Sequence, residues 1–227
     1  MSEVEGENDI ESQFGFPRLK DGSRLGWLMN MQPSDIKDPE TGLVISAVDY
    51  YFIEQDGRTF KLSVAKYPYF YIYVDEQYQS DIVSHLKIKF QKHIYNLEVQ
   101  AKEDLSLKNH LSGLKREYIK IEFFTINDLL HVRSHIAPFV SKNQDKKKLY
   151  DSYFVWENGS SENNDGNEKY KVNPLEYIKD IREYDVPYYI RVSIDLNIRV
   201  GYWYDISFRA GVPSIRHRFL SNILFLL

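Results

Sequence analysis

Apolar residues are concentrated in two stretches near the start of the chain, and the composition of these stretches predicts β-strands. Residues 26–31 and 44–53 are rich in β-branched, aromatic and other large apolar side chains, which is the composition of strands. The second stretch is followed by Asp56-Gly57 and then by another apolar and aromatic stretch at 59–64. An Asp-Gly pair supplies the positive φ angles that a tight turn requires. Residues 50–64 are therefore predicted to form a hairpin.

The middle of the chain changes between the period of a strand and that of a helix. Residues 69–74 read YFYIYV and predict a strand, and shorter strands are predicted at 97–101 and 117–124. A helix is predicted from 80 to 93, where Ile82, Leu86 and Phe90 recur at helical spacing opposite several lysines. A second helix is predicted to begin at Thr125, a cap candidate, and to break at Pro138.

Two further elements are predicted towards the end of the chain. Residues 174–182 are expected to form a short helix, with Pro174 in its first turn, and 188–196 a strand with alternating polarity. From residue 69 onward the order is then strand, helix, strand, strand, helix, strand. This βαββαβ order is shared by ferredoxin-like folds and RNA-recognition modules. We therefore predict an α+β fold, in which a β-rich section (24–64) packs beside a ferredoxin-like unit (69–200).

Composition narrows the class of protein. A chain of 227 residues has room for one large or two small domains, and its 43% hydrophobic and 27% charged residues are typical of a globular protein. The absence of cysteine excludes a disulfide, a thiolate zinc site, an iron–sulfur cluster and a cysteine nucleophile within these residues. The unusual feature is the number of tyrosines, 18 in all.

Three stretches differ from the rest of the chain. Residues 1–13 are acidic, with no basic residue, and predict a flexible solvated arm rather than a signal peptide. Residues 157–171 are polar and predict a flexible insertion, where the Asn158-Gly159-Ser160 sequon is idle without a secretory signal. The last nine residues, 219–227, are mostly large and apolar, but no stretch of the chain approaches the roughly 20 apolar residues that span a bilayer.

Candidate catalytic and metal-binding residues are few. His131 and His135 lie four residues apart on a predicted helix, but no HExxH pattern accompanies them, which favours a partly exposed helix surface over a metal site. Asp180, Glu183 and Asp185 lie beside Lys179 and Arg182, and this alternation of sign favours a structural ion-pair network over Mg²⁺ binding. We therefore predict no catalytic, cofactor-binding or metal-binding residue in this chain, and no small-molecule substrate.

The charge pattern and the tyrosines point to another kind of partner. Between residues 85 and 148 there are thirteen basic residues against seven acidic ones, a surplus that could meet phosphates. Strand alternation puts Tyr69, Tyr71 and Tyr73 on one face of their strand, and Tyr118 and Lys120 on one face of theirs. If these faces coincide, the sheet offers aromatic rings beside a lysine, as in single-strand binding proteins. The alternative is that the tyrosine-rich face packs against a neighbouring domain.

Several strings of residues together carry a resemblance to a known family. They are FGF at 14–16, GWLMNM at 26–31, SAVDYYFI at 46–53, YPYFYI at 67–72, KEDL at 102–105, NHL at 109–111, GLKR at 113–116, DIREYDVPY at 180–188 and IRVSID at 190–195. In order and spacing they resemble the start of the epsilon-type catalytic subunits among the family-B DNA polymerases. The resemblance covers about residues 10–210, and implies that 14–215 form the N-terminal domain of such a polymerase.

The resemblance implies a replicative, DNA-directed DNA polymerase of the nucleus that also proofreads with a 3′–5′ exonuclease. Its chemistry uses paired carboxylates and two Mg²⁺ ions, and its partners are template–primer DNA and accessory subunits. The full-length family protein also holds an iron–sulfur cluster and zinc. The catalytic acids belong to domains that follow this segment, and the first of them, an Asp-Ile-Glu string, does not occur after Asp205. This chain alone is therefore expected to be inactive and to flank the exonuclease and polymerase domains and the template strand.

The family pattern is followed to about Arg209, whereas the end of the chain departs from it. We expect residues 216–227 to be an apolar tail foreign to the family, arising from a frameshift, intron read-through or a fragmentary gene. The alternative to the polymerase interpretation is a free-standing module that binds single-stranded nucleic acid.

Overall fold

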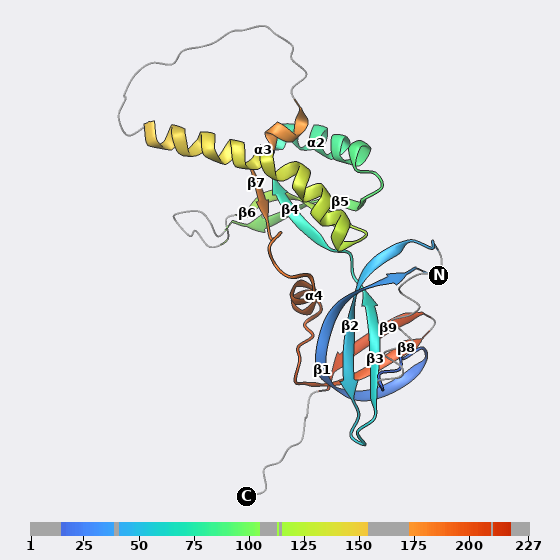
Figure 1. The fold of residues 1–227 in the computed structure, drawn as a ribbon. Coiled ribbons are helices and arrows are strands. Elements are labelled where there is room, and N and C mark those ends of the chain that lie inside the picture. The colour runs from blue at the N-terminus through green and yellow to red at the C-terminus, as the bar shows by residue number, and fades with distance from the viewer. Residues whose placement is uncertain are drawn as a thin grey trace, which may run out of the picture. The chain divides into compact units, whose positions relative to one another are not determined.

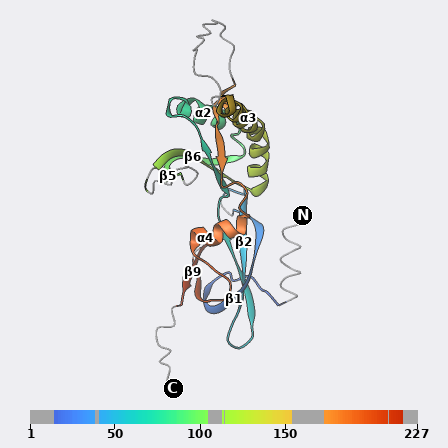
Figure 2. The same cartoon turned by 90° about the vertical axis from the view of Figure 1, so that its left-hand side faces the viewer.

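The computed structural model describes residues 15–38, 41–104, 113, 115–153, 173–209 and 211–218. The chain forms two compact units (Figures 1 and 2): the first contains the residues up to Tyr67 and those from Val186 onward, and the second is Pro68–Asp185. The predicted arm at 1–13, the predicted insertion at 157–171 and residues 219–227 of the predicted tail lie outside the described residues. None of the helices among the described residues has the length and apolar character that crossing a bilayer demands.

The first unit is built on a five-stranded antiparallel sheet. Its strands are β1 (Gly22–Lys37), β2 (Val44–Ile53), β3 (Thr59–Ala65), β8 (Trp203–Arg209) and β9 (Val212–His217), in the order β3-β2-β1-β8-β9. The long strand β1 bends through the sheet (Figure 1) and pairs first with β8, over 22–27, and then with β2, over 27–37. Because β3 and β9 also approach one another, the strand order resembles that of the partly open, five-stranded barrel of OB folds.

The hairpin of the first unit forms as predicted. Ile53 pairs with Thr59 and Phe52 with Phe60, and Gly57 adopts the positive φ of 85° that the turn requires. Phe52 and Phe60 stack with their ring centroids 5.2 Å apart in a fully buried core. Strand β1 passes this pair at Gly26, where a Cβ atom would lie 2.8 Å from Cβ of Phe52. Glycine at this position therefore lets the two strands approach closely.

The predicted strand at 188–196 is wrong, because these residues form helix α4 (Tyr188–Leu196) of the first unit. Pro187 precedes the helix, and Asn197 ends it in the left-handed conformation, at φ 52° and ψ 41°. Apolar residues at every second position also recur every four residues, so Tyr188 and Val192 share a helical face that packs on the core. Strands β8 and β9 were not predicted, and β9 includes Arg216 and His217 of the predicted tail.

The second unit has a ferredoxin-like topology, although its last strand is Asp180–Arg182 and not the predicted 188–196, and the α+β class is confirmed. Its elements are β4 (Tyr69–Tyr73), α2 (Glu76–Lys89), β5 (Ile94–Glu103), β6 (Lys115–Phe123), α3 (Ile126–Tyr153), the 3₁₀ turn η1 (Pro174–Tyr177) and β7 (Asp180–Arg182). The strand order is β5-β6-β4-β7, with every neighbouring pair antiparallel. One face of this sheet, with Phe70, Ile72 and Ile121, packs against Leu86 of α2 and Val132 of α3.

The bounds of three predicted helices need correction. Helix α2 ends at Lys89, so that Phe90 closes a turn and Ile94 begins β5. Helix α3 continues through Pro138 to Tyr153, because an exposed proline removes one hydrogen bond without obstructing the core. The segment 174–182 is a single 3₁₀ turn followed by β7, since Lys179 N–H donates to the carbonyl of Tyr73 at 2.9 Å and pulls the chain into the sheet.

Candidate functional site

The five residues predicted to contact nucleic acid lie on one face of the second unit's sheet. Strand β4 alternates, so Tyr69, Tyr71 and Tyr73 point away from the face that carries Phe70 and Ile72. Strand β6 runs beside it with Lys120 opposite Tyr71, and the rings of Tyr73 and Tyr118 have centroids 5.6 Å apart. The structure thus brings all five side chains together on the sheet face that the helices leave uncovered, which we call the tyrosine face.

Three of these rings are covered by cations from the same unit. The Nζ of Lys120 lies 4.3 Å from the centroid of the Tyr69 ring, and the Nζ of Lys102 lies 4.0 Å from that of Tyr71. The Arg116 guanidinium lies 5.4 Å from the centroid of Tyr73. Such cation–π contacts stabilise the face internally. They also occupy the ring surfaces on which a base would stack.

Each covering cation is held in turn by a carboxylate. Lys120 pairs with Glu122 at 2.6 Å, Arg116 with Asp104 at 3.0 Å, and Lys102 with Glu183 at 3.8 Å. Lys120 is only 14% exposed. The sequence pattern predicted the tyrosines and one lysine but missed Lys102 and Arg116. Lys102 reaches this face only through the pairing of β5 with β6. Arg116 lies on β6 at the two-residue spacing of Tyr118 and Lys120, so strand alternation was the signal that could have found it.

Two of the three carboxylates near residue 180, Asp180 and Glu183, form ion pairs, as the sequence predicted. Asp180 pairs with Arg182 at 2.6 Å, and Arg182 also lies 3.9 Å from Asp104. Glu183 is the partner of Lys102. As they stand, no three His, Cys, Asp or Glu side chains in the described ranges are placed to hold one metal ion.

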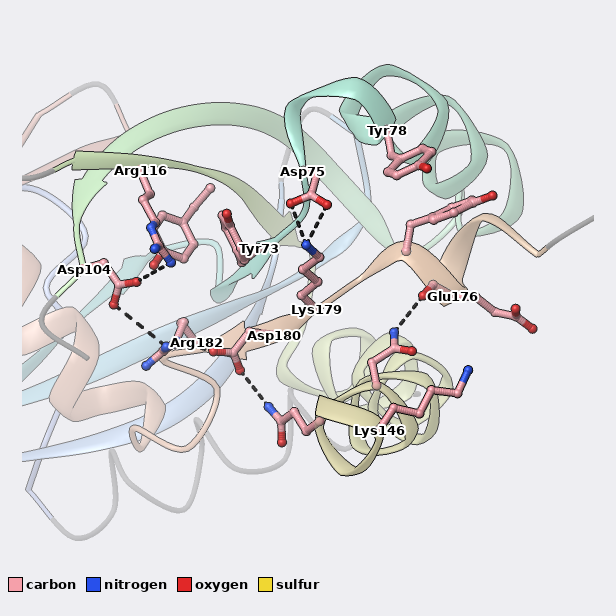
Figure 3. A pocket seen from close by; sticks show the side chains of 14 residues that line it. Tyr73, Asp75, Tyr78, Asp104, Arg116, Lys146, Glu176, Lys179, Asp180 and Arg182 are labelled. Atoms are coloured by element: carbon pink, nitrogen blue, oxygen red, sulfur yellow. Dashed lines mark hydrogen bonds and ion pairs between the residues drawn. The ribbon is translucent and has the colours of Figure 1, made fainter. Parts of the chain in front are cut away.

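A cavity of about 760 Å³ adjoins the tyrosine face within the second unit (Figure 3). Lys179 reaches across it to Asp75, at 2.6 Å, and Gln144 of α3 donates to Asp180 at 3.1 Å. Its walls include a stacked pair, Tyr78 and Tyr177, whose centroids are 3.9 Å apart. The residues that line it are Tyr73, Asp75, Tyr78, Asp104, Arg116, Tyr118, Asn143, Gln144, Lys146, Glu176, Tyr177, Lys179, Asp180 and Arg182. The charges of this lining are balanced, so the cavity has no strong preference for an anion.

Tyr118 joins the cavity to the tyrosine face. Its side chain is 5% exposed, and burial together with the negative charge of Asp104 raises the pKa of the phenol. The hydroxyl is therefore neutral at physiological pH and acts as a hydrogen-bonding group rather than as a base.

A solved structure with a similar fold is that of a family B DNA polymerase. The family B DNA polymerase from the archaeon Pyrobaculum calidifontis superposes with a TM-score of 0.50 at 14% identity, which covers 86% of this chain and 20% of that one. No family model matches the chain.

Sequence similarity identifies a particular relative. The DNA polymerase epsilon catalytic subunit of Schizosaccharomyces pombe is 41% identical over 217 residues, which is 95% of this chain and 10% of the relative. The corresponding protein of Arabidopsis thaliana is 38% identical over 202 residues, which is 88% of this chain and 9% of the relative. The chain is thus homologous to part of the DNA polymerase epsilon catalytic subunit, as the sequence strings indicated, and it spans about a tenth of the length of these relatives.

Proposed function

We propose that this chain is the N-terminal, non-catalytic portion of a nuclear replicative DNA polymerase similar to the epsilon catalytic subunit. The observation that carries the proposal is an identity of 38–41% over about nine tenths of the chain. In such a polymerase, DNA synthesis and 3′–5′ proofreading belong to domains outside this segment, as do the Mg²⁺ ions, the iron–sulfur cluster and zinc. Template–primer DNA and the accessory subunits are partners of the full-length protein.

Within that polymerase, the segment acts as a rigid flank to the exonuclease and polymerase domains. Ion pairs and cation–π contacts that close the tyrosine face from within support this role, because the face keeps its shape without a ligand. Lysines and arginines that already pair with carboxylates contribute little free energy to the binding of a phosphate, because one ion pair is only exchanged for another.

The test of the non-catalytic role is a primer assay with the purified chain. A labelled primer–template is incubated with the chain, Mg²⁺ and deoxynucleoside triphosphates, with the full-length S. pombe relative as the positive control. The primer is expected neither to lengthen nor to shorten. Turnover by the chain that is lost in Asp180→Asn or Asp185→Asn would overturn the proposal.

A second candidate function is a module that binds single-stranded nucleic acid. It is favoured by one observation, the gathering of Tyr69, Tyr71, Tyr73, Tyr118 and Lys120 on the face of a ferredoxin-like sheet that the helices leave uncovered. It requires Lys102 and Lys120 to leave the rings they cover so that bases can stack there. A module of this kind is expected to bind oligonucleotides with an affinity that decreases as the salt concentration rises and that is lower in the Tyr71→Ala variant.

A further inference from the structure

Basic side chains gather at one end of the helical layer of the second unit. Lys87 and Lys89 lie in the last turn of α2, and Lys92 follows in the turn that leads to β5. His131 and His135 lie one turn apart on α3. All five residues are exposed, and we call them the basic patch. The patch lies on the side of the sheet that α2 and α3 cover (Figures 1 and 2), opposite the tyrosine face.

A buried ring lies at the centre of the basic patch. The Nζ of Lys89 is 5.3 Å from the centroid of the Phe90 ring. The ring centroids of His131 and His135 lie 6.4 and 5.6 Å from the same centroid. Phe90 itself is only 3% exposed. The end of α2 and the start of α3 therefore present their basic groups side by side, over a ring that is closed to a base.

The lysines of the basic patch differ in their partners from the cations of the tyrosine face. Each cation that covers a tyrosine ring is paired with a carboxylate. In contrast, Lys87, Lys89 and Lys92 have no ion pair among the described residues. A phosphate that reaches these lysines does not have to displace a carboxylate, so its attraction is not offset by the loss of an ion pair.

The two histidines of the basic patch add positive charge when they are protonated. His135 Nδ1 lies 2.9 Å from the carbonyl oxygen of His131, and because a carbonyl only accepts, this Nδ1 carries the hydrogen. A proton taken up at Nε2 makes the ring a cation with a second donor. The charged and titratable groups that α2, the turn after it and α3 place around these rings are Lys89, Lys92, His93 and Asp128. The carboxylate of Asp128 is already paired with His93, at 2.6 Å.

We propose that the basic patch binds the phosphate backbone of duplex DNA without reading its sequence. Three lysines that meet three phosphates supply an affinity that is independent of sequence and dependent on salt. A duplex keeps its bases stacked inside, which fits a patch whose central ring is buried, whereas a single strand would stack its bases on an exposed ring. The choice of DNA over another polyanion rests on the proposed function, a portion of a DNA polymerase.

The test is fluorescence anisotropy of the full chain with a short labelled DNA duplex. Three phosphate contacts predict that the affinity falls about 40-fold between about 50 and about 200 mM salt. Lys87→Gln, Lys89→Gln and Lys92→Gln are each expected to remove one contact, so that the fall over the same range becomes about 12-fold. Lys89→Arg keeps the charge and is expected to keep the salt dependence of the wild type.

The matched control removes the same charge from a lysine of the same unit that has a carboxylate partner. Lys179 pairs with Asp75 at 2.6 Å, and Lys179→Gln is expected to leave the affinity and its salt dependence unchanged. The proposal is overturned if the duplex does not bind, if its affinity does not depend on salt, or if Lys179→Gln and Lys89→Gln have equal effects. The primer assay tests the proposed function separately, and none of these results changes its outcome.

A second measurement tests the part of the histidines. Lowering the pH from about 7.5 to about 6, a range in which histidine titrates, is expected to tighten binding of the duplex to the wild type. The gain is expected to be smaller in His131→Gln and in His135→Gln, and unchanged in His217→Gln, which alters an imidazole of the first unit. The same gain in all four proteins would remove the histidines from the proposed site.

Discussion

A buried ion pair shows how single residues stabilise the first unit. Lys61 and Asp49 are 3% and 4% exposed, and Lys61 Nζ lies 3.1 Å from Asp49 Oδ2. The other oxygen of Asp49 accepts hydrogen bonds from Ser34, at 2.9 Å, and from Ser63. Because the carboxylate is fully paired, its burial is tolerated, but it depends on the lysine.

Lys61→Met is therefore expected to lower the free energy of unfolding by about 3–5 kcal/mol, since it leaves the Asp49 carboxylate buried without its counter-ion. Urea denaturation measures the loss. Lys37→Met, which removes an exposed lysine of the same sheet, is the control and is expected to change stability by less than about 0.5 kcal/mol. Equal losses in the two variants would show that the pair contributes nothing specific.

A single histidine makes stability depend on pH. Burial and the charge of Lys89 lower the pKa of His85 on α2, and its Nε2 atom is buried without a hydrogen-bond partner among the described residues. As pH falls through about 6.5, the unfolded chain takes up a proton that the folded chain resists. The stability contributed by neutral His85 is thus present above that pH and is lost below it.

His85→Gln is expected to flatten the acid side of the stability profile. The urea midpoints of the wild type and the variant are compared from about pH 7.5 to about pH 5.5, the range in which histidine titrates. His217→Gln reports the effect of removing a histidine elsewhere. The same fall in midpoint for the wild type and His85→Gln would contradict the assignment.

At the scale of elements, one residue at the end of α4 has a conformation that favours glycine. Asn197 has φ 52°, with its N–H bonded to the Ile194 carbonyl at 3.2 Å and the Ile198 N–H bonded to that of Ser193 at 3.0 Å. Asn197→Ala is expected to cost about 1–2 kcal/mol, whereas Asn197→Gly is expected to be neutral or stabilising. Chemical denaturation measures the free energy of unfolding of both variants. A loss of stability in Asn197→Gly comparable to that in Asn197→Ala would mean that the asparagine side chain itself is required.

The elements that sequence predicted best are those specified locally. The bounds of β2 agree with the predicted 44–53, because its hairpin is fixed by Asp56-Gly57 and by the apolar and aromatic composition of the two adjoining strands. Helix α4 was mistaken for a strand because its apolar residues fit both periods, and packing of Val192 on the first unit's core decided between them. Strand β7 was missed because three residues carry no periodic signal, and pairing with β4 alone makes them a strand.

At the scale of the whole molecule, the sequence predicted the βαββαβ order but not how the chain divides. The second unit, Pro68–Asp185, is inserted between β3 and α4 of the first, so the first unit is completed only by residues after 185. Pairing of β1 with β8 joins positions about 180 residues apart, which no local pattern reports. Lys102 of the tyrosine face was missed for the same reason, because it lies on β5, whereas the tyrosines and Lys120 follow from alternation along β4 and β6.

The measurement that most directly tests a scaffold role for the tyrosine face is fluorescence anisotropy with a labelled single-stranded oligonucleotide. It is made on the wild type, Tyr71→Ala and Lys120→Ala at about 50 and about 200 mM salt, a range over which phosphate contacts lose much of their affinity. If the face is closed by its own ion pairs, the oligonucleotide is expected to bind no more tightly than in non-specific association, with a Kd of about 10⁻⁴ to 10⁻⁶ M, and equally to the three proteins. Tight, salt-dependent binding that Tyr71→Ala and Lys120→Ala both weaken would contradict it.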